Sequence, residues 1–261
     1  MTSPLLEVHR DGDLLRVRLN DPARANALSP TLVADLTEFY GRDLRAEGVR
    51  AVILTGAGKH FSAGADLDHL RSLANADIEH NRAESEKLRA LFAAILKQEA
   101  LTLALVHGSC VAGGCGLATA CDFVVAADDA TFLYSEVRIG FVAALVATYL
   151  PLRVKGADLR ELLLFPQPLG AAQALDMGLA NRVVPAADLA QAGDDLAGAI
   201  LTNASSESIA RTKRLLLDAL GRPLDEALAR AAEANAQARG TEDCRHGVAT
   251  FLETKKPPRW R

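Results

Sequence analysis

Two glycine-rich segments each follow an apolar run and precede a stretch with helical periodicity. They read Phe61-Ser62-Ala63-Gly64-Ala65-Asp66 and Val111-Ala112-Gly113-Gly114-Cys115-Gly116. Small residues let a ligand approach the backbone closely, and the first N–H groups of a helix have no intrahelical partner. Two such loops at one edge of a parallel sheet would aim two N–H donors at one oxygen, which is what an oxyanion hole requires. The alternative for either segment alone is an ordinary tight turn between a strand and a helix.

A third segment, Tyr134–Gly140, carries the carboxylate of Glu136 between a short apolar run and a longer apolar stretch. Apolar surroundings raise the pKa of a carboxyl group and let it exchange protons closer to neutral pH. The alternative for this segment alone is a surface glutamate paired with Arg138. Asp66 also has a purely structural alternative, as the N-cap of the helix that follows it.

Other chemistries have weaker support. Neither glycine segment has the Walker lysine or the G-x-G-x-x-G spacing of nucleotide-binding loops. The six histidines show no metal-ligand spacing, and His107 joins no Ser/His/Asp set. The four cysteines fit neither a disulfide framework nor a CxxC zinc site. We therefore expect reduced thiols and a cytoplasmic location, with Cys110, Cys115 and Cys121 as small core residues.

Charge and hydropathy argue against nucleic acid and membranes as partners. The net charge of −4 disfavours nucleic acid, since phosphate binding favours a positive surface. The longest nearly uncharged apolar stretch, Ile139–Leu152, is shorter than the ~20 residues that span a bilayer. The first fifteen residues lack the basic and apolar stretches of a signal peptide.

Hydrophobic periodicity predicts the elements that position these segments. We expect a hairpin over residues 5–19 and strands at 49–55, 101–106, 122–126, 131–134 and 183–185. Helices are expected at 30–44, from 66 with a break near 75, at 79–99, at 115–120, and over most of the chain after Gly140. This alternation predicts an α/β fold of βαβ units around a mainly parallel sheet. We divide the chain into a core, residues 1–197, and a helical C-terminal region, residues 198–261, ending in a solvated tail from Lys255.

Taken in order, the three segments resemble the crotonase family, the enoyl-CoA hydratases and isomerases. The likeness covers most of the chain. Asn20–Leu28 resembles the family's early coenzyme A loop, and Val52–Gly56 resembles the strand before the first glycine segment. Ala120–Asp122 resembles the end of the second glycine segment. Ala171–Ala180 and Val183–Pro185 resemble a later family signature.

The resemblance implies a spiral of βαβ units with a C-terminal helical region that assembles a homotrimer, or a hexamer as a dimer of trimers. It implies oxyanion N–H groups at Ala65 and Gly113 and a catalytic role for Glu136. It places the acyl-CoA against Ala63, Ala65, Asp66, Leu67, Asp68 and Gly113, and coenzyme A against Arg24 and Ala25. Coenzyme A is then part of the substrate, and no metal or redox cofactor is implied.

Two departures from the family bear on the reaction. The family's first catalytic glutamate falls on Gly116, and the glycine-rich stretch after the second is replaced by Phe141–Thr148, which predicts a more apolar pocket wall. A single glutamate favours double-bond isomerisation, but residues 135–140 with a glycine at 116 resemble a branch that includes hydratases. We interpret the chain as an enoyl-CoA hydratase-type lyase. The alternatives are a single-glutamate isomerase and a non-catalytic acyl-CoA-binding protein.

Overall fold

The computed structural model describes residues 4–260, so the expectations for residues 1–3 and for Arg261 lie outside the described residues. A six-stranded sheet forms the centre, in the spatial order β1-β2-β3-β4-β6-β9. β1 and β2 are antiparallel, and the other neighbouring pairs are parallel. The predicted hairpin and mainly parallel sheet are therefore confirmed. The strands are β1 (Leu6–Asp11), β2 (Leu14–Leu19), β3 (Ala51–Gly56), β4 (Leu101–Val106), β6 (Phe123–Ala127) and β9 (Arg182–Val184).

A small second sheet contains β5 (Ser109–Val111), β7 (Thr131–Leu133) and β8 (Leu169–Gly170), in the order β5-β7-β8. The sequence predicted β7, but it placed β5 within a loop and did not predict β8. Strands of two or three residues are too short to show the alternation that marks a strand. This sheet matters for the site because β5 leads into the second glycine segment and β7 leads to Glu136.

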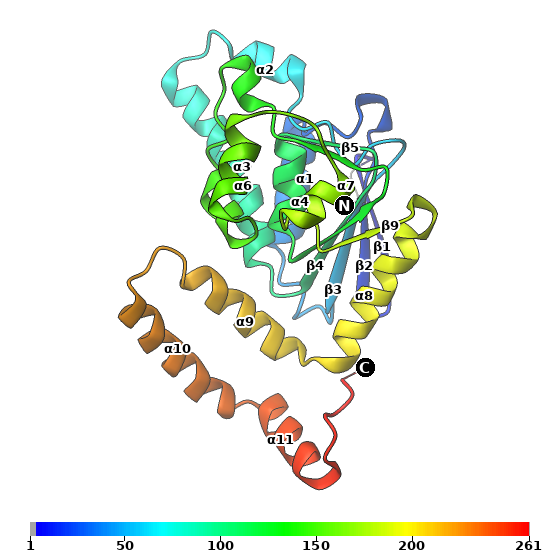
Figure 1. Cartoon of the computed structure of the whole chain (residues 1–261), viewed down its shortest axis with the longest axis vertical. Helices are drawn as coiled ribbons and strands as arrows, with labels where there is room; N and C mark the ends of the chain where they lie inside the picture. The colour runs from blue at the N-terminus through cyan, green and yellow to red at the C-terminus, as the bar shows by residue number, and fades with distance from the viewer. Residues whose placement is uncertain (1–3, 261) are drawn as a thin grey trace.

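Helices cover both faces of the main sheet (Figure 1). β3 shows why, because Val52 and Leu54 belong to one apolar cluster while Ala51 and Ile53 belong to another. The first cluster includes residues of α1 (Pro30–Gly41) and α3 (Ile78–Lys97), and the second includes residues of α8 (Leu189–Asn203). A strand covered on both faces reads as the continuous apolar run seen in the sequence. Cys110, Cys115 and Cys121 are free and buried, as predicted.

The chain after Gly140 is mostly helical, as predicted, with short helices as far as Asp176 and helices of 13–16 residues from Leu189 onward. Glu136–Ile139 and Leu150–Leu152 are single 3-10 turns. The helices are α5 (Val146–Tyr149), α6 (Gly156–Leu164), α7 (Ala171–Asp176), α8, α9 (Ser206–Asp218), α10 (Leu224–Arg239) and α11 (Glu242–Thr254). No helix within residues 4–260 is long and apolar enough to cross a membrane.

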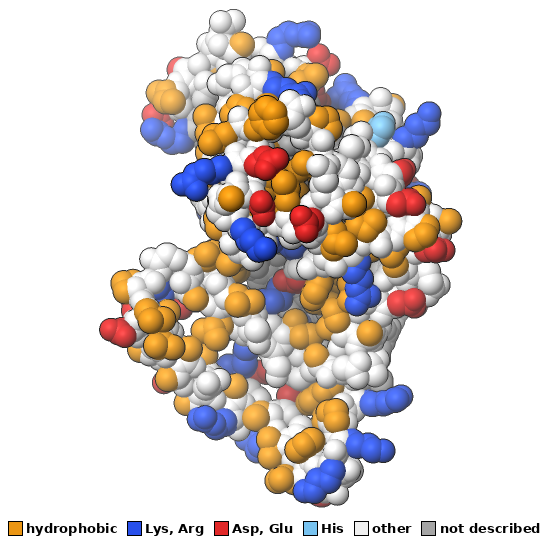
Figure 2. All heavy atoms as spheres, in the orientation of Figure 1, with side chains coloured by type: hydrophobic (Ala, Val, Ile, Leu, Met, Phe, Trp, Pro, Cys, Tyr) orange, Lys and Arg blue, Asp and Glu red, His pale blue; other side chains and the backbone are white. Residues whose placement is uncertain are grey.

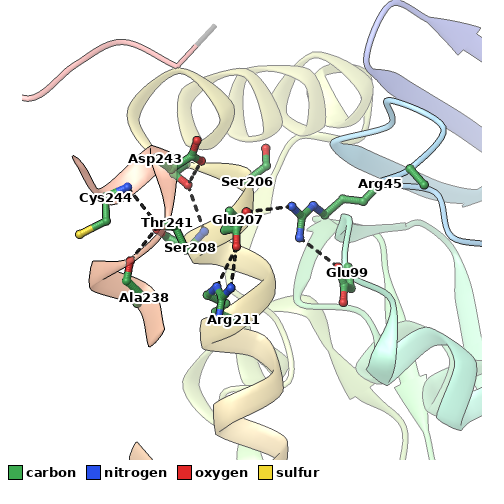
Figure 3. A network of polar contacts seen from close by, with 12 residues as sticks. Arg45, Glu99, Ser206, Glu207, Ser208, Arg211, Ala238, Thr241, Asp243 and Cys244 are labelled. Atoms are coloured by element: carbon green, nitrogen blue, oxygen red, sulfur yellow. Dashed lines mark hydrogen bonds and ion pairs between the residues drawn. The ribbon is translucent and has the colours of Figure 1, made fainter. Parts of the chain in front are cut away.

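Polar contacts attach the protruding C-terminal helices to the body (Figures 1 and 3). Arg45, which follows α1, forms ion pairs with Glu99 and with Glu207 of α9, at 3.0 and 3.3 Å. Within the helical region, the Ser205 hydroxyl donates to a carboxylate oxygen of Asp243, which joins the start of α9 to α11. Residues 255–257 and 259 of the predicted solvated tail are exposed, but its end contacts α8, since the Trp260 N–H donates to the Thr202 carbonyl at 2.8 Å.

Candidate functional site

The two glycine segments lie side by side. The Val111 N–H donates to the Ser62 carbonyl at 2.9 Å, and the Ser62 N–H donates to the Ser109 carbonyl at 3.2 Å. A Cβ built on Gly64 would lie 3.2 Å from the Gly113 nitrogen and only 2.4 Å from the Val111 carbonyl oxygen. Gly64 also has a φ of +82°, so glycine is required at this contact. The two glycine segments are therefore adjacent in the structure, as the sequence predicted.

Two amides at this junction are available to a ligand. Ala65 is exposed, and Gly113 is half-buried as the first residue of α4 (Gly113–Ala120). Within residues 4–260, neither the Ala65 N–H nor the Gly113 N–H donates to a protein acceptor. Free donors on adjacent loops are the arrangement that an oxyanion hole requires. Their catalytic role stays a prediction.

The backbone next to the Gly113 amide is strained. Ala112 has φ +47° and ψ −115°, a conformation that residues with a Cβ rarely adopt. Such a residue costs about 1–3 kcal/mol and persists only where its surroundings hold it. Here the Ala112 N–H donates to the Leu133 carbonyl at 2.7 Å, and its carbonyl accepts from the Gly116 N–H at 3.1 Å. The same contact with Leu133 brings the chain that leads to Glu136 against the second glycine segment.

Asn26 joins the first loop of the chain to the first glycine segment, and sequence reasoning missed this role. Its side chain is fully buried, and its Oδ1 accepts from the Asp21 N–H at 3.0 Å. Its carbonyl accepts from the Ser62 hydroxyl at 2.8 Å. Its side-chain nitrogen, Nδ2, lies within hydrogen-bond distance of three carbonyl oxygens at 2.8–3.2 Å, those of Ala57, His60 and Phe61. The only signal in the sequence for this role was the position of Asn26, a polar residue directly before the apolar Ala27 and Leu28.

Asp66 is the N-cap of α2 (Leu67–Leu73), which confirms its structural alternative. Its carboxylate accepts from the Asp68 and His69 N–H groups at 2.9 and 3.2 Å. The same carboxylate pairs with Arg24 at 3.0 Å, which connects the proposed coenzyme A loop to the first glycine segment. Both carboxylate oxygens of Asp66 thus have protein partners. Contacts of Asp66, Arg24 and Ala25 with a ligand stay predictions.

The remaining predicted contact residues lie on the open side of this segment. Ala63, Leu67 and Asp68 are exposed, with Leu67 at 72% despite its apolar side chain. An exposed leucine two residues after a free amide is consistent with an apolar contact for a ligand held at that amide. The structure gives no ligand contact for any of them, so their roles stay predictions.

Glu136 lies three residues after the end of β7, as the first residue of a 3-10 turn. Burial raises the pKa of its carboxyl group above the ordinary value. Its Oε2 is buried and, within residues 4–260, has no hydrogen-bond partner. The alternative pairing with Arg138 is wrong, because that guanidinium binds the Pro166 carbonyl instead. An unpartnered carboxylate oxygen with a raised pKa has the properties of a general acid or base.

No side chain fits at residue 116 without displacing its neighbours. A Cβ on Gly116 would lie 2.7 Å from Val146 Cγ1, 2.8 Å from Phe92 Cζ and 3.2 Å from Tyr149 Oη. The position where the family has its first glutamate is therefore filled by two apolar side chains and a phenol. Val146 belongs to the stretch 141–148, which predicted a more apolar wall.

A cavity of about 740 Å³ elsewhere in the molecule is not this site. It lies between the edge of the main sheet and the start of α8, and Ile53, Leu105 and Leu189 are among its lining residues. It contains none of the predicted site residues. We therefore locate the candidate site from the free amides and Glu136 rather than from cavity size.

Comparisons with known proteins identify the family and the fold. The sequence model of the family "Enoyl-CoA hydratase/isomerase" matches residues 9–261. The chain is 42% identical over 250 residues to a Thermus thermophilus protein named "Putative enoyl-CoA hydratase", covering 95% of this chain and 98% of the relative. It is 30% identical to the short-chain-enoyl-CoA hydratase of Clostridium acetobutylicum, covering 95% of each chain. The structure matches the crystal structure of an enoyl-CoA hydratase from Mycobacterium smegmatis with a TM-score of 0.90 and 31% identity, covering 99% of each chain. The chain therefore belongs to the enoyl-CoA hydratase/isomerase family, the crotonase family that its three glycine and glutamate segments resemble.

Proposed function

We propose that this chain is an enoyl-CoA hydratase-type enzyme, a lyase that acts on an acyl-CoA thioester. One observation carries the proposal: the free amides of Ala65 and Gly113 lie on hydrogen-bonded neighbouring loops, and β7, which pairs with the strand that enters the second loop, leads to Glu136. The Oε2 of Glu136 has no partner within residues 4–260. The names of the relatives from Thermus and Clostridium support hydration as the reaction.

In the proposed reaction, the thioester oxygen accepts from both amides. Water adds its hydroxyl to the β-carbon, electron density moves to the thioester oxygen as an enolate, and the α-carbon then takes a proton. Glu136 accepts the proton of the water and supplies the proton to the α-carbon, so it is regenerated in each turnover. Removing one donor from a comparable oxyanion site costs about 2.7–4 kcal/mol.

Coenzyme A enters as part of the substrate. The proposed contacts are Arg24 and Ala25 on the early loop and residues 63–68 on the first glycine segment. The ion pair of Arg24 with Asp66 and the Asn26 side chain hold these two segments together. One rigid unit therefore carries both the proposed coenzyme A contacts and the first oxyanion amide.

Double-bond isomerisation is the second candidate. The packing of Phe92, Val146 and Tyr149 around Gly116 favours it, since it leaves Glu136 as the single carboxylate among the predicted catalytic positions. One carboxylate is sufficient to move a proton between the α- and γ-carbons. A relative in Arabidopsis thaliana, 27% identical over 266 residues, is named as a peroxisomal dienoyl-CoA isomerase.

We also propose that the chain assembles as a homotrimer or as a dimer of trimers, in the cytoplasm. α10 and α11 have no fully buried residue, and each carries an apolar stripe. The stripes are Leu224 and Leu228 on α10, and Val248, Phe251 and Leu252 on α11, all at least half exposed. Figure 2 shows hydrophobic side chains gathered on this protruding region. Copies of the chain would bury these stripes against one another.

A panel of 2-enoyl-CoA and 3-enoyl-CoA thioesters tests the reaction. Hydration of a 2-enoyl-CoA that is lost in Glu136→Gln supports the proposal. Migration of the double bond in a 3-enoyl-CoA without hydration supports the second candidate. Calorimetry that detects acyl-CoA binding by a chain without turnover would instead indicate a non-catalytic binding protein.

A further inference from the structure

Tyr149 makes a buried hydrogen bond to the helix that carries the Gly113 amide. Its hydroxyl donates to the Gly116 carbonyl at 2.9 Å. The side chain is 5% exposed, and its ring packs edge-on to Phe92 with the ring centres 5.9 Å apart. Gly116 lies in the first turn of α4, three residues after Gly113. The phenol therefore holds the turn whose N-terminus presents the proposed oxyanion donor.

The chain segment that ends at Tyr149 also carries Glu136. Before Glu136, the Leu133 carbonyl accepts from the Ala112 N–H; after it, the Tyr149 hydroxyl binds Gly116. One continuous segment thus contacts the start of α4 on both sides of the carboxylate. In between, the Arg138 guanidinium binds the Pro166 carbonyl, but residues 140–142 are exposed and Glu136 Oε2 has no partner within residues 4–260.

We propose that Tyr149 is a positioning residue, which fixes the Gly113 amide relative to the Glu136 carboxylate. The proposal rests on the proposed function and deepens it, because it concerns the alignment of the same two groups. Tyr149 does not exchange protons itself, since burial raises the pKa of its phenol far above neutrality and keeps it a neutral donor.

The hydroxyl, rather than the ring, has this role. Phenylalanine at 149 would keep the edge contact with Phe92 and the filled space beside Gly116. The Gly116 carbonyl would lose the bond from the phenol and keep its bond within α4 and the long contact from the Thr119 hydroxyl, at 3.4 Å. Loss of a buried hydrogen bond weakens the hold on this turn, and small displacements at a catalytic donor have large effects on rate.

The experiment compares Tyr149→Phe with two controls in the full chain. We expect Tyr149→Phe to lower kcat roughly ten-fold, with KM and the pH dependence of kcat/KM unchanged. Tyr40→Phe is the first control, since the Tyr40 hydroxyl is buried without a partner within residues 4–260, and it should keep wild-type kcat. Leu36→Ala is the second, because it loosens the apolar core around α1 while it leaves the hydrogen bond, and it should lower stability more than kcat.

Binding of acetoacetyl-CoA gives a readout that a merely structural role would not move. Its enolate absorbs in the near ultraviolet, so absorbance of the bound ligand reports stabilisation at the oxyanion amides. The enolate fraction should fall in Tyr149→Phe and stay at the wild-type level in both controls. Wild-type kcat and enolate fraction in Tyr149→Phe, or an equal loss of kcat in Leu36→Ala, would overturn the proposal. A wild-type chain without turnover would instead overturn the proposed function.

Discussion

The body of the protein and its C-terminal helices differ in how completely the single chain buries their apolar side chains and pairs their polar groups. In the body, apolar clusters fill both faces of the main sheet, and backbone hydrogen bonds join the glycine segments. In the C-terminal region, α10 and α11 bury no residue fully, and ion pairs such as Arg45–Glu207 contribute to the attachment alongside the buried Ala210 of α9. Half-exposed ion pairs contribute little to stability, commonly about 0–1 kcal/mol each.

This contrast separates two tasks. The site needs donors fixed before the ligand arrives, and main-chain hydrogen bonds between packed segments provide that. The C-terminal helices present apolar stripes that the single chain leaves open, which is expected of a surface that another subunit covers. The body should therefore determine the chemistry, and the C-terminal region the assembly.

Glu136→Gln should have the largest effect on the body. Glutamine keeps the shape of the side chain but cannot exchange a proton, so we expect kcat to fall roughly 10²- to 10⁴-fold with acyl-CoA affinity retained. Steady-state kinetics and calorimetry measure the two quantities. Near-wild-type turnover by Glu136→Gln would show that Glu136 is not the catalytic acid or base.

Gly113→Pro should follow, with a loss of about 10²–10³-fold in kcat, because it deletes one of the two proposed oxyanion donors. Proline is tolerated at the first position of a helix, and Gly113 holds that position in α4. Gly113→Ala is the matched control, since it adds a Cβ near Leu28 but keeps the N–H. Equal losses in the two variants would mean that crowding, not the donor, explains the effect.

Leu228→Ser combined with Phe251→Ser should shift the assembly toward smaller species. Both residues lie on the exposed stripes of the C-terminal helices, at 57% and 51% exposure. Light scattering coupled to size-exclusion chromatography should show loss of the wild-type oligomer, with Asn235→Ser on α10 as the control. A wild-type chain that is monomeric at all concentrations would contradict the proposal that the C-terminal helices assemble an oligomer.

Ala112→Gly should stabilise the body by about 1 kcal/mol, because it relieves the positive φ beside the Gly113 amide. Ala118→Gly in the same helix should destabilise by a similar amount, since it lies in the helix interior. Denaturant unfolding measures both. Equal destabilisation by the two substitutions would show that the strain at Ala112 has no energetic consequence.

The pH dependence of stability gives the smallest effect. The folded-state pKa of Glu136 is raised, so the folded chain holds this proton more tightly than the unfolded chain does. Stability therefore decreases as pH rises from the unfolded pKa through the folded one. Glu136→Gln should raise Tm at roughly pH 8 and have no such advantage near pH 4. An equal change in Tm at both pH values would indicate that ionisation of Glu136 has no part in it.

The sequence predicted those parts of the fold and site that local pattern determines. Val49–Thr55 and Leu101–Val106 read as strands because both of their faces are buried, and Ser29-Pro30 marked the start of α1. The role of Asn26 and the contact of Tyr149 with Gly116 were missed, because their partners lie more than thirty residues away. The convergence of the glycine segments was predictable because parallel strands end at one edge of a sheet.

The central claim is that the amides of Ala65 and Gly113 hold one thioester oxygen while Glu136 faces the neighbouring carbons. A crystal structure of Glu136→Gln with a bound 2-enoyl-CoA tests this most directly, because the substrate should persist uncleaved and unhydrated. We predict the thioester oxygen at roughly 2.7–3.1 Å from both amide nitrogens, with the substituted side chain at position 136 against the α- and β-carbons. A thioester oxygen bound elsewhere, or a side chain at position 136 turned into solvent, would contradict the account.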